Sequence, residues 1–311
     1  MESVLVTGGM GFIGSHLIEE LLRKGIRVTV IDDLSNGSKE NLQDVWENIE
    51  FIHADISKIS LNIKTSFDVI FHLAAHPRSF SLIDPYRNLE VNVKGTINIL
   101  ELARRKGCKV IFTSNSGIYG EPKFLPVDEN HPNDPLTPYD VTKLAAEHLI
   151  KIYHKNYGVP CVIFRLATIY GERQRVNEKL KWRPVVAEFV RKVLSNEPPI
   201  IYGDGKQTRD FTYVKDIVKG LILGAEKDSG NGEIMILSTG KETSINELFE
   251  KICQITGIKV QPKHAPPLPG DIRRMVYSFE KAKQLIGYEP EYTLDMGLRR
   301  YIKWYQEKLM R

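Results

Sequence analysis

The sequence is poor in cysteine and contains no long apolar run. Cys108, Cys161 and Cys253 are odd in number, far apart and without Cys-x-x-Cys spacing, so we expect reduced thiols and neither a disulfide framework nor a metal site. No segment approaches the roughly 20 uninterrupted apolar residues of a membrane span. The start at Met1 lacks the charged and apolar regions of a signal peptide. These absences favour a cytoplasmic protein that does not enter a membrane.

The chain also carries no large excess of charge of either sign. Its 43 Lys and Arg residues and 39 Asp and Glu residues leave a formal net charge of +4, and the basic residues are spread among the acidic ones. Without a basic stripe, nucleic acid is not expected as the main partner. Repeats and low-complexity tracts are absent, and 311 residues with 42% hydrophobic content suit a larger and a smaller domain.

The first half of the chain alternates short apolar runs with helical patterns. This alternation predicts a doubly wound parallel sheet that is covered on both faces. The predicted strands lie at 3–7, 26–31, 49–53, 68–73, 109–113 and 160–166. The predicted helices lie at 12–24, 85–106 and 138–157, the last with Thr137 as N-cap and Pro138 at its first position.

The pattern changes near residue 170. We therefore place a larger domain at 1–170, with a return segment at about 211–226, and a smaller mixed α/β domain at 171–311. In the smaller domain the sequence predicts helices at 183–195, 244–256 and 294–309 and extended pieces near 199–202, 233–238 and 258–262.

A glycine-rich turn follows the first predicted strand. Gly8, Gly11 and Gly14 allow a tight turn, close approach of main chain to a pyrophosphate and close packing of the next helix, whose N-terminus presents unpaired N–H groups. Asp32 and Asp33 end the second strand about 20 residues beyond this loop, where a carboxylate accepts hydrogen bonds from ribose hydroxyls and repels a 2′-phosphate. The sequence therefore predicts a Rossmann-type domain that binds NAD rather than NADP.

Tyr139 and Lys143 lie four residues apart in a predicted helix, and so share one face of it. A neighbouring ammonium and the positive end of the helix both favour the phenolate, so we expect a lowered pKa for the Tyr139 phenol and a role for it as a base. The alternative interpretation is that Tyr139 and Lys143 lie on an exposed face of the helix and have no catalytic role.

The chain resembles the extended short-chain dehydrogenase/reductase family, in particular its NAD-dependent sugar-nucleotide epimerases and dehydratases, and is most like the UDP-glucose 4-epimerases. The resemblance runs nearly from end to end. It is carried by Thr7–Gly14, Asp55-Ile56, His72–Ala75, Asn92–Thr96, Tyr119-Gly120, Pro138–Lys143 and Gly203–Val214.

The resemblance implies a set of residues for each part of the site. Those implied for the cofactor NAD are Gly8, Gly11, Phe12, Ile13, Gly14, Asp32, Asp33, Asn36, Asp55, Ile56, Leu73, Ala74, Ala75, Asn92, Tyr139 and Lys143. Those implied for the nucleotide-sugar substrate are Arg78, Ser116, Thr168, Arg209, Asp271 and Arg274, with Arg209 on the diphosphate. The family also implies a homodimer joined through helices 85–106 and 138–157.

The two residues at positions 116 and 117, shortly before Tyr119, distinguish the reactions within the family. Dehydratases place an Asp-Glu pair there and decarboxylating relatives a Glu, whereas this chain has Ser116 and Gly117. Without that acid, elimination and decarboxylation lack their usual proton carrier. We therefore expect 4-epimerisation of a UDP-hexose of the glucose/galactose kind by transient oxidation at C4. The alternatives are another sugar-nucleotide epimerase, a dehydratase or a reductase, or a nucleotide-binding protein without catalysis.

The chain departs from the family pattern at several places. Asn115 stands where relatives carry the catalytic Ser or Thr, so either its amide or a shifted Ser116 bonds the sugar oxygen. Thr168 replaces a usual Asn, and Leu268 replaces an Arg near the nucleotide diphosphate, for which Arg273 and Arg274 offer compensation. Arg78 either contacts an acidic group of the substrate or lies on the surface beside a structural His76.

Overall fold

The computed structural model describes residues 1–311 except 59–62, 175, 177–182, 269 and 310–311. Within these described residues, seven parallel strands form one central sheet in the order β11-β6-β5-β4-β1-β2-β3. The strands are β1 (Ser3–Thr7), β2 (Arg27–Asp32), β3 (Ile49–His53), β4 (Val69–His72), β5 (Lys109–Asn115), β6 (Cys161–Leu166) and β11 (Ile234–Leu237). The prediction of a Rossmann-type α/β fold is confirmed.

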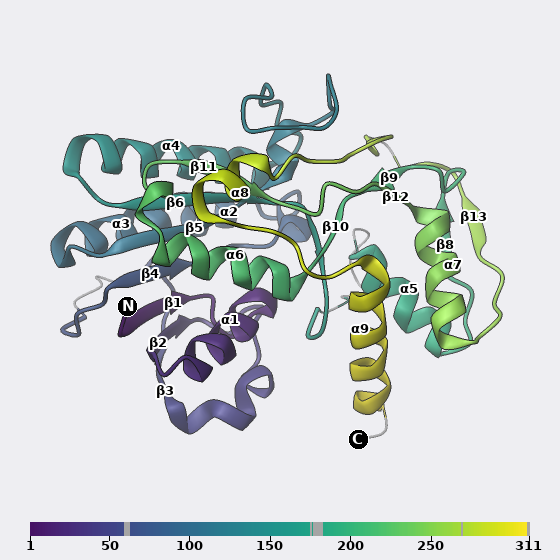
Figure 1. Ribbon diagram of the computed structural model, residues 1–311, viewed down its shortest axis with the longest axis horizontal. Coiled ribbons are helices and arrows are strands. Elements are labelled where there is room, and N and C mark those ends of the chain that lie inside the picture. Colours follow the sequence, from purple (N-terminus) through teal and green to yellow (C-terminus); the bar gives the residue numbers. More distant parts are fainter. Residues whose placement is uncertain (59–62, 175, 177–182, 269, 310–311) are drawn as a thin grey trace.

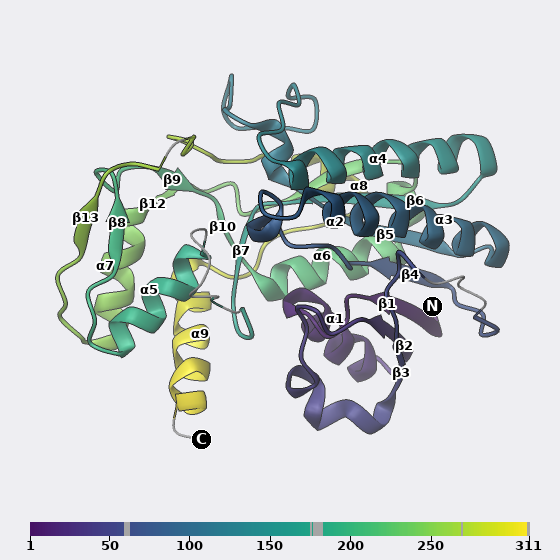
Figure 2. The same ribbon diagram turned by 180° about the vertical axis from the view of Figure 1, so that it is seen from behind.

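Helices cover both faces of this sheet (Figures 1 and 2). One face carries α1 (Phe12–Arg23), α6 (Val214–Glu226) and α8 (Glu280–Ile286). The other carries α2 (Pro85–Asn88), η3 (Leu89–Lys94), α3 (Gly95–Lys106) and α4 (Pro138–Tyr157). Because α2, η3 and α3 follow one another directly, the predicted helix at 85–106 is one helical stretch with a wider, π-helical turn in η3.

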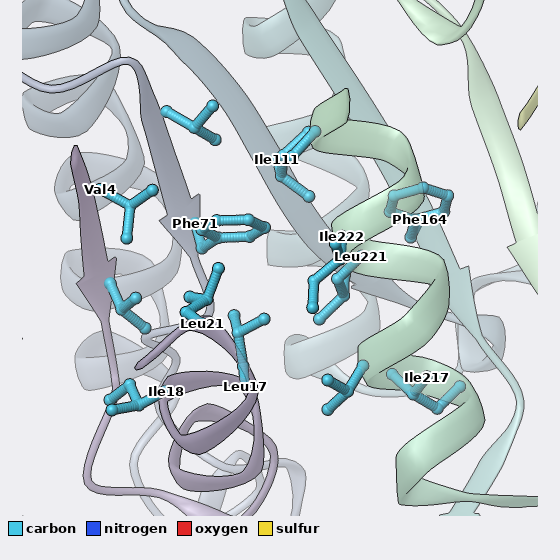
Figure 3. Close-up of a cluster of buried hydrophobic side chains, with 14 of the residues drawn as sticks. Val4, Leu17, Ile18, Leu21, Phe71, Ile111, Phe164, Ile217, Leu221 and Ile222 are labelled. Atoms are coloured by element: carbon cyan, nitrogen blue, oxygen red, sulfur yellow. The ribbon is translucent and has the colours of Figure 1, made fainter. Parts of the chain in front are cut away.

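The two faces account for the continuous apolar runs of the strands. Val4 and Val6 of β1 pack in one core and Leu5 between them packs in the other, because successive side chains of a strand point to opposite faces. In the first core, Leu17 and Leu21 of α1 lie near the strands, and the labelled residues of α6 lie beside them (Figure 3). Each such buried side chain contributes about 1.5–3 kcal/mol. This packing fixes α1, and with it the glycine-rich turn that precedes it.

A smaller unit lies beside the carboxyl end of the sheet (Figure 1). Its helices are α5 (Val185–Leu194), α7 (Ile245–Thr256) and α9 (Leu294–Leu309), which share a core with Phe12 and Ile13 at its edge. Its short strand pairs are β7 (Thr168–Tyr170) with β10 (Phe211–Tyr213), β9 (Thr208–Arg209) with β12 (Thr243–Ser244), and β8 (Ile200–Tyr202) with β13 (Lys263–Ala265). The 3-10 helices of the described residues are η1 (Lys39–Asn48), which is kinked at Leu42, η2 (Arg78–Phe80), η4 (Ser116–Tyr119) and η5 (Asp228–Gly230).

Two details differ from the sequence prediction. The strand predicted at 258–262 is wrong, since the pairing with β8 uses Lys263–Ala265. The extended piece near 233–238, predicted with the smaller domain, is β11, and it pairs with β6 at the edge of the central sheet. Among the described residues, no helix combines the length and apolar composition needed to cross a bilayer.

Candidate active site

A cavity of about 330 Å³ lies at the carboxyl ends of β1, β2, β3 and β4, where ligands bind in open α/β sheets. Most of the residues implied for the cofactor line it. These are Gly8, Gly11, Phe12, Ile13, Gly14, Asp32, Asp33, Asn36, Asp55, Ile56, Leu73, Ala74 and Ala75. The same cavity is also lined by His76, Arg87, Val91 and Thr113, which no sequence pattern assigned to the cofactor.

The wall of the cavity at the glycine-rich turn consists of main chain. Gly8 has a φ of +71°, and a Cβ there would lie 2.7 Å from the Ala74 nitrogen. A Cβ on Gly14 would lie 2.4 Å from the Gly8 carbonyl oxygen. Gly11 is the N-cap residue of α1 and offers no side-chain cap, so the first N–H groups of the helix stay available to an anion. The turn therefore fits a pyrophosphate.

Asp32 holds this turn in place. One of its carboxylate oxygens accepts a hydrogen bond from the Met10 nitrogen at 2.9 Å, and the other accepts from the Leu34 nitrogen at 2.8 Å. Burial raises the pKa of Asp32, whereas the two amide hydrogen bonds oppose that shift. The residue implied for the ribose hydroxyls thus also fastens the loop after β1 to the end of β2.

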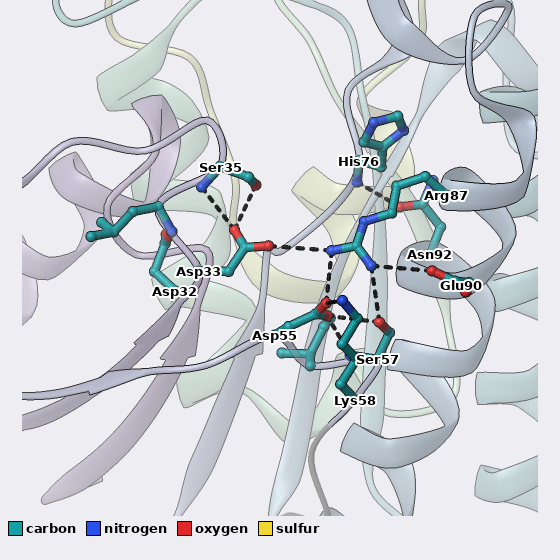
Figure 4. A network of polar contacts seen from close by, with 12 residues as sticks. Asp32, Asp33, Ser35, Asp55, Ser57, Lys58, His76, Arg87, Glu90 and Asn92 are labelled. Carbon is teal, nitrogen blue, oxygen red and sulfur yellow. Dashed lines mark hydrogen bonds and ion pairs between the residues drawn. The ribbon is translucent and has the colours of Figure 1, made fainter.

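An ion-pair network closes one side of the cavity around Arg87 (Figure 4). The guanidinium Nη2 of Arg87 lies 2.9 Å from Asp55 and 3.3 Å from Asp33, and Nη1 lies 3.3 Å from Glu90. Although burial opposes ionisation of Asp55, hydrogen bonds from Ser57 and Arg87 lower its pKa. One cation thereby joins the ends of β2 and β3 to α2.

A buried relay fixes the cavity wall formed by Ala74. The Thr96 hydroxyl donates to the Asn92 carbonyl at 2.6 Å, so it accepts from His72 Nε2, 3.0 Å away. The Ala74 nitrogen donates to the Thr7 hydroxyl oxygen, whose proton then points to His72 Nδ1 at 2.8 Å. Burial lowers the pKa of His72 to about 3 and so keeps the imidazole neutral.

Three residues implied for the cofactor do not line the cavity within the described part of the chain: Asn92, Tyr139 and Lys143. Asn92 lies behind the cavity wall. Its amide oxygen accepts from the His76 nitrogen at 2.9 Å, and its amide nitrogen donates to the Thr142 hydroxyl at 3.0 Å. The Thr142 hydroxyl donates in turn to the Tyr139 carbonyl at 2.9 Å. Asn92 therefore connects the cavity wall at His76 with the first turn of α4.

The first turn of α4 begins as predicted, with Thr137 as N-cap and Pro138 at the first position. One turn later, the ammonium of Lys143 lies 4.0 Å from the ring centroid of Phe112, and the side chain is buried. Burial lowers the pKa of Lys143 to about 7, although the Glu147 carboxylate opposes the shift. Lys143 can consequently release or take up a proton near neutral pH.

The predicted lowering of the Tyr139 pKa is wrong for the protein alone. Burial raises this pKa to about 12, the adjacent Asp140 carboxylate raises it further, and Arg78 lowers it. The expected lowering assumed a full positive charge on Lys143, whereas the buried carboxylate of Asp140 opposes formation of the phenolate. With a pKa of about 7, Lys143 carries only part of that charge at neutral pH.

A buried ion pair anchors the middle of α4 to the sheet. Arg165 of β6 donates to both carboxylate oxygens of Glu147, at 3.1 and 2.7 Å, and to the Tyr119 hydroxyl at 2.9 Å. Since Glu147 follows Lys143 by one helical turn, this pair fixes the height of the Lys143 ammonium above β5.

Asn115 and Ser116 are the two candidates for bonding the sugar oxygen, and they differ in their hydrogen-bond partners. The Asn115 amide oxygen accepts from the Gly117 nitrogen at 2.6 Å and caps η4, while its buried amide nitrogen has no hydrogen-bond partner among the described residues. The Ser116 hydroxyl hydrogen-bonds to the phenol of Tyr277. Asn115 thus retains an unused donor, and Ser116 is already engaged.

Gly117 faces the carboxylate of Asp140. A Cβ at position 117 would lie 2.4 Å from Asp140 Oδ1 and 2.7 Å from the Asn115 amide oxygen. No side chain can therefore be placed at position 117 unless Asp140 moves.

The residues implied for the substrate lie apart from the cavity and are partly engaged with acids. Arg209 pairs with Asp271 and donates to the Ile272 carbonyl at 2.7 Å. Arg274 is exposed and pairs with Glu242 at 2.8 Å, so it is less free to compensate for Leu268 than the sequence suggested. Thr168 is partly buried at the start of β7.

Comparisons with known proteins agree over nearly the whole chain. Residues 5–301 match the family model for GDP-mannose 4,6-dehydratase. The chain is 36% identical over 312 residues to UDP-glucose 4-epimerase of Mycolicibacterium smegmatis, with 98% of both chains covered. The structure of UDP-glucose 4-epimerase from Thermotoga maritima with UDP-glucose is 34% identical, with a TM-score of 0.92 and 99% of both chains covered. UDP-glucuronic acid 4-epimerase from Bacillus cereus, in complex with UDP-glucuronic acid and NAD, is 33% identical, with a TM-score of 0.87 and coverage of 98% of this chain and 99% of that one.

Proposed function

Since this chain belongs to the NAD-dependent family of sugar-nucleotide epimerases and dehydratases, we propose that it interconverts two UDP-hexoses that are epimers at C4, namely UDP-glucose and UDP-galactose. Its cofactor is NAD, as in the B. cereus relative. The main-chain wall at Gly8 and Gly14 fits the pyrophosphate of this cofactor, and the carboxylates of Asp32 and Asp33 fit an unphosphorylated ribose.

The contact between Gly117 and Asp140 carries the choice of reaction. Relatives that eliminate water or carbon dioxide need an acid at position 116 or 117, and here Ser116 is bonded to Tyr277 while Asp140 fills the space beside Gly117. Epimerisation requires no further acid, because a single group takes and returns the proton of the 4-hydroxyl. The geometry therefore favours epimerisation over dehydration or decarboxylation.

Each residue of the site has a stated task in this proposal. Tyr139 Oη takes the proton of the sugar 4-hydroxyl and later returns it. Bound NAD supplies the acceptor and donor of the C4 hydride. Lys143, with a pKa near 7, provides positive charge next to Tyr139 and takes part in proton exchange. The unpaired amide nitrogen of Asn115 donates to the sugar oxygen.

The nucleotide diphosphate is assigned to Arg209. Asp271 and the carbonyl of Ile272 fix the guanidinium in one orientation and leave part of its N–H fork for phosphate oxygens. Thr168 and Arg274 remain proposed contacts at the edges of this region, on the strength of the resemblance alone.

We also propose a homodimer joined through the helices at 85–106 and 138–157. Tyr86, Leu89, Val141 and Ile152 on these helices are large apolar side chains that are about half or more exposed. A symmetric four-helix contact would remove them from water. The thiols of Cys108, Cys161 and Cys253 are free, which agrees with the cytoplasm as the compartment.

The test is incubation of purified, NAD-loaded protein with UDP-galactose and chromatographic detection of UDP-glucose. We expect interconversion without net consumption of NAD. No turnover of either nucleotide sugar, with NAD bound, would overturn the assignment. Turnover of UDP-glucuronic acid or UDP-N-acetylglucosamine instead would retain the reaction and change the substrate. Light scattering that shows a monomer would refute the dimer.

A further inference from the structure

Asp140 is a wholly buried carboxylate in the first turn of α4, directly after Tyr139. Its Oδ2 accepts from the Thr137 hydroxyl at 2.6 Å. Its Oδ1 faces Gly117 and has no hydrogen-bond partner in the part of the chain that the structure describes. A buried carboxylate with half of its acceptor capacity unused is costly unless a cation compensates it.

Arg78 supplies that cation from a different element. Its Nη2 lies 3.4 Å from Asp140 Oδ2, and its side chain is 52% exposed, so the guanidinium covers the buried carboxylate from the solvent side. η2, which carries Arg78, packs against α4. The charge of Arg78 reaches the phenols of both Tyr139 and Tyr277. The ion pair thus lies at the helix turn that carries Tyr139, the residue that the proposed reaction uses.

We propose that Asp140 and Arg78 are positioning residues that act as an opposed pair of charges on Tyr139, and that their balance sets the pH range in which its phenol exchanges a proton. This inference rests on the proposed role of Tyr139 as the base. Asp140 opposes formation of the phenolate and Arg78 favours it, so removal of one partner has the reverse effect of removal of the other.

Among the described residues, Asp140 and Arg78 are the charged groups that shift the pKa of the Tyr139 phenol. Lys143 lies one turn further on α4, and its positive charge is partial near neutral pH. Near this turn, η3, β5 and η4 contribute the uncharged residues Asn92, Asn115 and Ser116. Arg87 of α2, which also packs against α4, is paired with Asp33, Asp55 and Glu90. The C-terminal segment contributes Tyr277, whose pKa burial raises.

The experiment follows the ionisation of Tyr139 itself. Holoprotein labelled with 13C at tyrosine Cζ is titrated by NMR, and the Tyr139 signal is assigned by its loss in Tyr139→Phe. We expect Arg78→Gln to move the titration to higher pH and Asp140→Asn to move it to lower pH, each by about half a pH unit or more. The double variant should return close to the parent protein. Arg78→Lys, which keeps the charge, should shift it less than Arg78→Gln.

Shifts of both single variants in the same direction, or no shift in either, would overturn the proposal. Arg104→Gln, which removes an exposed cation on α3 that pairs with Glu101 at 2.8 Å, is the matched control and should leave the titration unchanged. If the protein interconverts UDP-sugars, the pH profile of kcat should move in the same directions. If it does not, the proposed function fails, while the NMR titration still decides whether the pair acts on Tyr139.

Discussion

The carboxylate of Asp33 and the guanidinium of Arg87 lie 3.3 Å apart on the wall of the dinucleotide cavity. Asp33 directly follows β2, whereas Arg87 lies in α2, and Asp55 shares the same guanidinium. One cation between two carboxylates therefore holds together the part of the cavity assigned to the adenosine.

Arg87→Gln should weaken NAD binding by about tenfold, or ~1.4 kcal/mol. Without the guanidinium, Asp33 and Asp55 repel each other and their loops lose the arrangement that receives the adenosine. Titration calorimetry with NAD measures the change. Arg104→Gln serves as control, because it removes an exposed arginine that does not line the cavity. Equal affinity of the Arg87 variant and the parent protein would show that the network does not shape the site.

Gly14→Ala should abolish measurable NAD binding. The added methyl group would lie 2.4 Å from the Gly8 carbonyl oxygen and 2.7 Å from the Gly9 Cα, so either the turn or α1 must move. Gly107→Ala is the control, because its φ of +70° makes alanine cost about 1 kcal/mol of stability, although no atom of the described residues lies within 4 Å of the new methyl group. Thermal shift with and without NAD separates the two effects. Normal NAD binding by Gly14→Ala would contradict the assignment of the turn.

Tyr139→Phe should lower kcat by about 10²- to 10⁴-fold and leave NAD bound. The substitution removes only the hydroxyl that exchanges the proton, and the packing of the ring is retained. Tyr157→Phe, an exposed tyrosine at the end of the same helix, should be without effect. Unchanged turnover in Tyr139→Phe would remove this residue from the mechanism.

Asn115→Ala should lower kcat at least about tenfold, because it removes the unused buried donor next to the sugar site. Asn115→Ser restores the hydroxyl that relatives carry and should keep more activity. Ser116→Ala loses only the bond to Tyr277 and should have the smaller effect. The reverse order, with Ser116→Ala the more damaging, would assign the sugar oxygen to Ser116.

The free energy of unfolding should decrease as the pH is lowered from 6.5 to about 3. Burial lowers the pKa of both His16 and His72 from 6.5 to about 3, so in this range the unfolded chain binds protons that the folded protein does not. Each histidine then contributes up to about 1.4 kcal/mol per pH unit to the free energy of unfolding, which rises with pH. Urea unfolding at several pH values measures the slope. His16→Gln should reduce it, and an unchanged slope would contradict the neutral, buried state of His16.

The sequence predicted the parts of the molecule that depend on local pattern. Continuous apolar strands such as the one at Val4 revealed a sheet buried on both sides, and the spacing of Gly8, Gly11 and Gly14 located the cavity. Tyr139 and Lys143 could be selected because four residues make one helical turn. Contacts between distant segments lay beyond such patterns.

Three findings illustrate that limit. Arg87 belongs to the cavity only because α2 folds back toward the ends of β2 and β3. The effect of Asp140 on Tyr139 depends on burial under η4 and on an arginine from η2, so the pKa of Tyr139 could not be predicted from Lys143 alone. β11 lies far along the chain from β6, and nothing in its own residues distinguished a strand of the central sheet from one of the smaller unit.

The late arrival of β11 has a consequence for synthesis on the ribosome. Until residues 234–237 have left the exit tunnel, β6 remains an unpaired edge, with its hydrogen-bonding groups open to other nascent chains. The part of this core that α8 covers stays bare even longer, since α8 ends at Ile286. The dinucleotide-binding half therefore cannot complete its sheet and its core until residue 286 has been synthesised, and its open edge and apolar surface can associate with other chains until then.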